Sequence, residues 1–332
     1  MDFTTSSARN RFQAFAWALL AYNIPVILWG AYVRISFSGD GCGANWPFCN
    51  GQAIPQHMGA RTLIEYTHRM MTSLDAFAAI ALCVWAFLSF PRKHPARLYS
   101  LLSLLFLFIE GLLGAGLVLL RLVAKNQSLL RAGYLSAHLT NTLLLLAALT
   151  VTAWLASEKL VRVPWRSAPA ELLGALGVAA LVSVTGAIAA LGDTLFPASS
   201  LALGMRQDFS SASSLLLRLR LFHPVIAVTG AAYLVWITTQ ILRRPGSDGA
   251  RSAASRVITI TFFQLAAGVI NLTLLAPVWM QLLHLLLADV LWISLIALLL
   301  EVIEVIVREP SGNPVSQQAS FGIRSAGASS QL

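Results

Sequence analysis

Residues 64–90, IEYTHRMMTSLDAFAAIALCVWAFLSF, combine a long apolar run with a histidine near its first end. About 20 apolar residues in a helix suffice to cross the hydrocarbon core of a bilayer. Because isolated polar side chains are costly there, an intramembrane histidine such as His68 indicates a functional site. This one stretch therefore predicts both a membrane helix and the place of a site on it.

The rest of the chain has the same character. Of its 332 residues, 57% are hydrophobic and 11% are charged, and the mean hydropathy is +0.72, which excludes an ordinary soluble domain. We therefore predict an all-α integral membrane protein with eight transmembrane helices. The expected spans lie near residues 13–35, 64–90, 97–121, 132–156, 170–191, 215–242, 255–276 and 279–307.

The positions of Lys and Arg predict the orientation of these spans. Most of the 23 basic residues fall at the termini and in the loops that lead from an even-numbered span to the next odd-numbered one. Because such residues concentrate on the inner side of a membrane, both termini are expected in the cytoplasm, with the protein in a bacterial inner membrane. The formal charge of +9 then reflects this rule and contact with anionic lipid, and nothing supports nucleic-acid binding.

The spans are predicted to form two tandem four-helix bundles related by a pseudo-twofold axis. Gly30 precedes His68 by 38 residues, and Gly186 precedes His223 by 37. The third and seventh spans carry FIEGLLGAGL and FFQLAAGVIN, with glycines in matching places. The predicted divisions are a cytoplasmic N-terminus at 1–12, a first half at 13–156, a cytoplasmic linker at 157–169, a second half at 170–307 and a disordered cytoplasmic tail at 308–332.

Four histidines share one depth in the even-numbered spans. They are His68, His138, His223 and His284, each a few residues inside the outer end of its span. Neutral imidazole is a usual ligand of haem iron, and facing helices of a bundle are a usual place for such a site. Pairing them within each half predicts two bis-histidine porphyrin sites. One such histidine alone could simply hydrogen-bond a neighbouring helix, but four at matching places favour ligation.

The three cysteines divide between the outer side and a span. Cys42 and Cys49 lie in the outer loop between the first two spans, where an oxidising compartment favours a disulfide. Cys83 lies within the second span and is expected to be a buried free thiol.

Glu65 lies three residues before His68, on the same face of the helix. A carboxylate there could stabilise developing positive charge or handle a proton, which makes Glu65 the catalytic candidate. The other interpretation is an ion pair between Glu65 and Arg69 at i, i+4. No acid stands three residues before His223, which predicts chemistry in the first half and a permanent cofactor in the second.

Arginines on the histidine side are candidates for binding porphyrin propionates, because a planar guanidinium can bind a carboxylate bidentately. The candidates are Arg69, Arg218 and Arg220. Anchoring at the membrane interface is the ordinary role of any one of them taken singly.

Several of these segments together resemble the haem A synthase family. The resemblance rests on SGDGC at 38–42, NWPFCNGQ at 45–52, EYTHR at 65–69, GLLGAGLVL at 111–119, His138 followed by Thr140-Asn141, and WMQLLH at 279–284. It covers nearly all eight spans, and the cysteine loop with the E-x-x-H-R run is its specific part. The second half lacks the further outer cysteine pair that some relatives carry, which puts in doubt any role that requires two disulfides.

The resemblance implies an oxidoreductase that converts the C8 methyl group of haem O to a formyl group through successive hydroxylations, with water as the oxygen source. The product, haem A, would serve terminal oxidases. His68 and His138 would bind the haem O substrate, with Glu65 supporting its oxidised intermediate. His223 and His284 would hold a haem b cofactor. The loop disulfide would be that of the family.

The resemblance also implies partners. A haem O synthase, which is a protohaem farnesyltransferase, would supply the substrate, and assembly of a haem–copper oxidase would use the product. A homo-oligomer is compatible with the sequence.

Other functions stay open at this stage. A di-haem electron carrier like a membrane cytochrome b would bind similar cofactors, although such a carrier usually places its haems at opposite depths. A haem-handling assembly factor would need the histidines but not Glu65. A transporter has the least support, because the spans show no obvious pair of broken helices.

Overall fold

The computed structural model describes residues 6–157, 163–210, 214–243 and 247–308, and the regular elements in these ranges are helices joined by loops, without a strand. Eight helices are long and apolar enough to cross a membrane, so the prediction of an all-α, eight-span protein is confirmed. The predicted tail lies outside the described residues from 309 onward. The same holds for residues 1–5 of the predicted N-terminus and 158–162 of the predicted linker.

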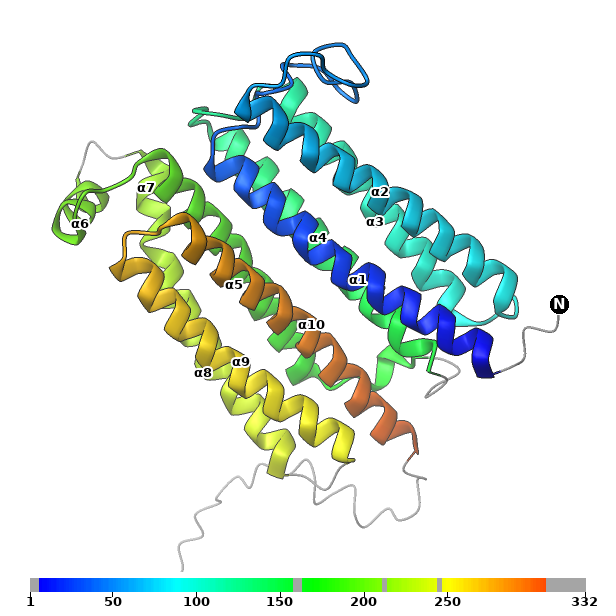
Figure 1. Ribbon diagram of the computed structural model, residues 1–332. Helices are drawn as coiled ribbons and strands as arrows, with labels where there is room; N and C mark the ends of the chain where they lie inside the picture. Colours follow the sequence, from blue (N-terminus) through cyan, green and yellow to red (C-terminus); the bar gives the residue numbers. More distant parts are fainter. Residues whose placement is uncertain (1–5, 158–162, 211–213, 244–246, 309–332) are drawn as a thin grey trace, which may run out of the picture.

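The first four spans pack together. They are α1 (Ser6–Ile35), α2 (Ala60–Ser89), α3 (Pro95–Leu119) and α4 (Leu129–Leu155). Each packs against the next, and α4 returns to pack against α1 (Figure 1). This closed ring buries the facing apolar side chains and leaves outward residues such as Phe77 and Leu88 exposed, as a lipid-facing surface requires.

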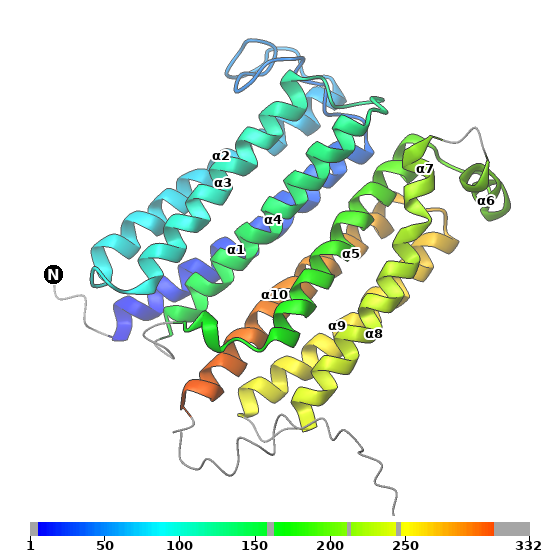
Figure 2. The ribbon, with the colours of Figure 1, turned by 180° about the vertical axis from the view of Figure 1, so that it is seen from behind.

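The last four spans form a second group of the same kind. They are the span of α7 and α8 (Leu215–Arg220 and Phe222–Arg243), together with α5 (Ala170–Leu195), α9 (Asp248–Thr273) and α10 (Val278–Arg308). Helix α5 packs on α8, α8 on α9, α9 on α10 and α10 on α5 (Figure 2). The arrangement by halves follows from these contacts, whereas the pseudo-twofold relation between the halves stays a prediction.

The sixth span is interrupted between α7 and α8, at Leu221. Pro224 follows three residues later. Proline has no N–H, so it cannot bond to the carbonyl of Arg220 and disfavours a continuous helix at this point. The interruption lies immediately before His223, at the end of the bundle where the predicted sites lie.

Two elements depart from the sequence expectation. A short helix, α6 (Leu201–Phe209), lies in the loop before α7 and projects beside the bundle (Figure 1). Helix α9 begins at Asp248 rather than near 255, because the Ser247 hydroxyl accepts from the N–H of Ala250 at 3.1 Å and Asp248 complements the positive end of the helix dipole. Hydropathy alone could not place this polar first turn.

The two groups join along a seam formed by α1, α4, α5 and α10. Helices α4 and α10 are the most buried spans. Trp292 of α10 donates its Nε1–H to the carbonyl of Leu143 on α4 at 2.7 Å. Helix α1 begins and α10 ends at the same end of the bundle, opposite the disulfide loop (Figure 1). The seam therefore holds the two groups side by side, with their ends aligned.

Candidate functional site

The four predicted histidines lie on four different helices at one end of the bundle. His68 is on α2, His138 on α4, His223 on α8 and His284 on α10. Each lies within about three turns of the N-terminal start of its span, at 3.6 residues per turn. His68 lies near His138, and His284 lies near His223. The structure thus brings together the two pairs that the sequence predicts.

Glycines make room for three of these imidazole rings. An added Cβ at Gly30 of α1 would stand 3.0 Å from Cε1 of His68, and one at Gly186 of α5 would stand 3.0 Å from Cε1 of His223. At Gly268 of α9, the corresponding distance to His284 is 3.2 Å. Each ring therefore packs directly on the backbone of a neighbouring helix. Gly30, Gly186 and Gly268, which suggested a repeat, are therefore contact points for histidines, whereas an added Cβ at Gly114 in the third span would meet nothing within 4 Å among the described residues.

His138 has a different neighbour. Its Nδ1 lies 2.8 Å from Oε1 of Glu110 on α3. The same carboxylate accepts hydrogen bonds from the Thr142 hydroxyl and the Asn141 amide, each at 2.5 Å. The sequence alone gives Glu110 no chemical role. The signal that could have singled it out is an acidic residue within an apolar span, four residues before Gly114.

The other imidazoles lack such a carboxylate. Nδ1 of His68 and Nδ1 of His284 are buried without a hydrogen-bond partner among the described residues. Nδ1 of His223 lies 3.1 Å from the Thr185 hydroxyl, which donates to the carbonyl of Val182. Thr185 can therefore accept the Nδ1 proton of His223 and leave its Nε2 available as a ligand.

Glu65 is buried beneath the disulfide loop. One carboxylate oxygen accepts from the backbone N–H of Cys42 at 2.8 Å, and the other accepts from Nη2 of Arg69 at 2.5 Å. The i, i+4 ion pair that the spacing allowed is therefore present. These contacts hold the carboxylate about one turn from His68 and tie it to the loop, while its catalytic role stays a prediction.

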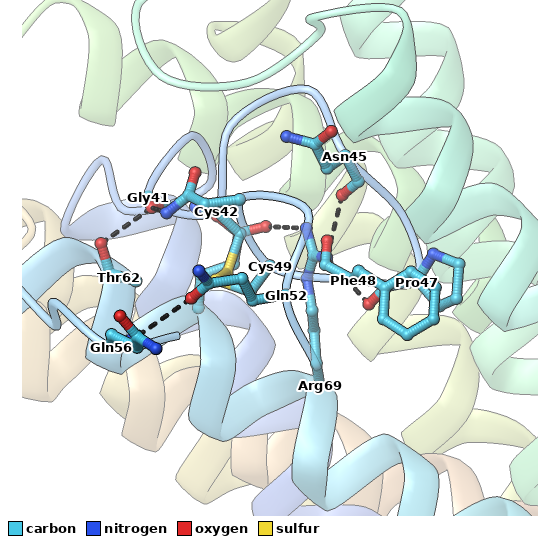
Figure 3. Close-up of a disulfide and its surroundings, with 12 residues drawn as sticks. Gly41, Cys42, Asn45, Pro47, Phe48, Cys49, Gln52, Gln56, Thr62 and Arg69 are labelled. Carbon is cyan, nitrogen blue, oxygen red and sulfur yellow. Dashed lines mark hydrogen bonds and ion pairs between the residues drawn. A yellow bond between two sulfur atoms is a disulfide. The ribbon is translucent and has the colours of Figure 1, made fainter. Parts of the chain in front are cut away.

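Arg69 reaches from α2 into the loop that the disulfide closes (Figure 3). Its Nη1 donates to the carbonyls of Asn45 and Phe48, both at 2.9 Å, and of Pro47 at 3.2 Å. The predicted disulfide between Cys42 and Cys49 is confirmed. The ion pair, the disulfide and the contacts of Arg69 together hold this loop at the end of the bundle where the first pair of histidines lies.

The cysteine and arginine predictions have different outcomes. Cys83 is free and buried, as expected. Arg220 donates to Asp208 of α6 at 2.7 Å and to Asp193 of α5 at 3.1 Å, so it ties the segment that carries α6 to the bundle. Arg218 lies on α7 beside it. Propionate binding by Arg69, Arg218 and Arg220 stays a prediction, and two of the three already hold loops in place.

Arg34 is a further cation, partly buried, that joins the two halves. From α1 it donates to the carbonyl of Ala190 at 2.7 Å and to the hydroxyl of Thr194 at 2.6 Å, both on α5. Arg34 lies one turn beyond Gly30, and Ala190 lies one turn beyond Gly186. This contact therefore links the helices that support His68 and His223.

The donor set fits a porphyrin better than a bare metal ion. Among the described residues no group of three or more His, Cys, Asp and Glu could hold a metal. Haem iron takes four ligands from the porphyrin and needs only axial ligands from protein. Two paired imidazoles per half, with buried Nδ1 atoms on His68 and His284, meet that requirement.

Comparison with known proteins places this architecture in a family. Residues 13–296 match the COX15-CtaA family, described as cytochrome oxidase assembly protein. The chain is 42% identical over 307 residues to a Thermus thermophilus protein named protoheme IX farnesyltransferase, covering 90% of this chain and 49% of that protein.

Shorter matches relate the chain to proteins named heme A synthase. That of Exiguobacterium is 35% identical over 94 residues, which is 28% of this chain and 31% of the relative. That of Halalkalibacterium halodurans is 39% identical over 95 residues, which is 29% of this chain and 32% of the relative. The alignments thus span about half the length of the Thermus protein and about a third of these synthases. By its match over residues 13–296, the chain belongs to the COX15-CtaA family of cytochrome oxidase assembly proteins.

Proposed function

We propose that this protein is a haem A synthase, which oxidises the C8 methyl group of haem O to a formyl group. The observation that carries the proposal is the pairing of four histidines at one end of eight spans. Membership of a cytochrome oxidase assembly family and the partial matches to heme A synthases support the same conclusion.

The proposed reaction removes four electrons and releases four protons, which come from the substrate methyl group and from water together. A first oxidation with water converts the methyl group to a hydroxymethyl group. A second gives a geminal diol, which loses water to become the formyl group. The net change is R–CH₃ + H₂O → R–CHO + 4 e⁻ + 4 H⁺, so the protein must orient the methyl group, admit water and release protons.

Each half would have its own task. His68 and His138 would hold haem O, and the packing of His68 on Gly30 sets the place of that ring. Glu65 would act on the substrate from the position that the Cys42 N–H and Arg69 give it. A haem b held by His223 and His284 would supply one-electron redox chemistry to the second half.

The Thermus relative supports a partner for this reaction. It is named for haem farnesylation, and about half of its length lies outside the alignment with this chain. We infer that the unaligned half carries the farnesyl transfer and that, for this chain, a protohaem farnesyltransferase supplies haem O. Oxidase assembly would then use haem A. The basic loops support a bacterial inner membrane with cytoplasmic termini.

The test is extraction and chromatography of haems from the purified protein, produced with and without a haem farnesyltransferase. We expect haem b in both preparations, and haem O, a hydroxylated intermediate or haem A only with the transferase. Glu65→Gln should retain bound haem but lose haem A. Haem b alone in both preparations, at two per chain, would favour the di-haem electron carrier. Normal haem A from Glu65→Gln would remove Glu65 from the chemistry.

A further inference from the structure

Glu110 stands out among the acidic residues within the spans, because it touches one of the four histidines. It lies on α3 and faces α4, where its Oε1 is 2.8 Å from Nδ1 of His138. Asn141 donates to Oε2 and Thr142 donates to Oε1. Both carboxylate oxygens are therefore held, and the carboxylate is fixed against the ring nitrogen that would face away from a bound iron.

Within each pair of the described structure, one imidazole has a polar side chain close to its Nδ1 and the other has none. In the first half Nδ1 of His138 lies 2.8 Å from the Glu110 carboxylate, a close charge contact without an aligned hydrogen bond, while Nδ1 of His68 is buried with no polar partner among the described residues. In the second half His223 faces a hydroxyl, that of Thr185, and His284 resembles His68. A carboxylate is a much stronger hydrogen-bond acceptor than a hydroxyl. Glu110 therefore supports His138 in the first half more strongly than Thr185 supports His223 in the second half.

The position in the second half that corresponds to Glu110 carries a neutral residue, Gln264. Glu110 lies four residues before Gly114, and Gln264 lies four residues before Gly268. Nε2 of Gln264 lies 3.5 Å from Nε2 of His284. The chain therefore has a carboxylate beside a histidine in one half and an amide beside a histidine in the other.

We propose that Glu110 is a positioning residue that makes His138 the fixed, strongly donating ligand of the porphyrin in the first half, with His68 as its exchangeable ligand. This inference rests on the proposed function. A carboxylate that accepts the Nδ1 proton orients a ligating imidazole and raises its basicity. A substrate porphyrin must enter and leave, so one firm and one exchangeable ligand suit the first half.

The experiment compares Glu110→Gln with wild type in the full chain, loaded with porphyrin by co-expression with a haem farnesyltransferase. Loss of the carboxylate should favour ferrous over ferric iron in the first half. A tenfold change in that preference raises the midpoint potential by 59 mV for a one-electron couple. Retention of the first-half porphyrin should fall about 10–100-fold, as for other outer-shell partners of metal ligands.

Two matched variants separate positioning from structural support. Thr142→Val removes a hydrogen bond to Glu110 but leaves the carboxylate beside His138, so the potential should not move. Gln264→Glu introduces a carboxylate near Nε2 of His284 rather than near its Nδ1, so it should not lower the potential of the second-half haem as Glu110 lowers that of the first. If Thr142→Val shifts the potential as much as Glu110→Gln does, Glu110 only ties α3 to α4.

The exchange of ligands has its own readout. His68→Ala should retain a porphyrin with one histidine ligand and an altered spectrum, whereas His138→Ala should lose it. Equal losses from both variants would contradict the division of roles. A wild-type protein with no first-half porphyrin would overturn the proposed function itself. A loaded wild type whose potential and retention are unchanged by Glu110→Gln would overturn this inference alone.

Discussion

A Cβ atom at Gly30 would stand 3.0 Å from the His68 ring, closer than ordinary van der Waals contact. We predict that Gly30→Ala displaces this ring. Overpacking costs about 1–3 kcal/mol, and about 1.4 kcal/mol corresponds to tenfold in binding. Retention of the first-half porphyrin should therefore weaken roughly tenfold, as measured by haem content after purification. Gly111→Ala, on an exposed face with nothing within 4 Å of its added Cβ, is the control. Equal loss in both variants would show that the effect is not local.

Arg69 and Glu65 form a largely buried pair, with side chains 11% and 4% exposed. Arg69→Ala would leave Glu65 without its cation and three loop carbonyls without their donor. Breaking such a pair costs about 3–5 kcal/mol, so we expect a clear fall in thermal stability in detergent and faster proteolysis of the disulfide loop. Arg61→Ala is a matched control. Its partner Asp40 is 3.7 Å away and both side chains are about half exposed, so its loss should cost only about 0–1 kcal/mol.

At the scale of elements, helix α3 begins with a titratable cap outside the spans. Nδ1 of His94 accepts from the N–H of Ala96 at 3.2 Å, and its ring stacks on Phe90. Burial lowers the pKa of His94 below its ordinary value of 6.5.

This cap predicts a loss of stability in acid. The pKa of His94 is lower in the folded protein than in the unfolded chain, so the unfolded chain binds a proton first as pH falls. The stability that neutral His94 contributes is therefore present above about pH 6.5 and is lost below it. Protonation also removes the cap acceptor and places a positive charge at a helix N-terminus. Thermal unfolding at pH 7.5 and 5.5 tests this. His94→Asn keeps a cap acceptor without titrating, and it should show a smaller fall; an equal fall would exclude His94 as the cause.

The fold at this scale could largely be predicted from sequence. Hydropathy and length are local properties, and they place the spans to within a few residues. The exceptions have local causes that hydropathy does not report. Examples are the Ser247 cap that starts α9 early and the interruption before Pro224.

At the scale of the whole molecule, Arg34 links the two halves through α5. Arg34→Ala would remove donors to Ala190 and Thr194, and hydrogen bonds from a charged group contribute about 1.5–3 kcal/mol each. We therefore expect the melting temperature in detergent to fall by several degrees. Because Arg34 joins the helices behind His68 and His223, porphyrin retention should fall in both halves. Arg92 is an exposed residue of the loop between α2 and α3, and Arg92→Ala should change neither the melting temperature nor porphyrin retention. Loss confined to one half would contradict the link.

The sequence by itself determined the membrane class, the eight spans, the loop disulfide and the common depth of the histidines. These follow from composition and from counting residues along a helix, because depth in a membrane is set by rise per residue. The rotation of each helix about its axis, and the path of each loop, are decided only when helices pack.

Tertiary structure therefore decided which groups meet. It placed Glu110 against His138, set Gly30 against His68, and directed Arg69 to loop carbonyls. Contacts between side chains distant in sequence depend on the packing of whole helices, and local pattern does not specify that packing.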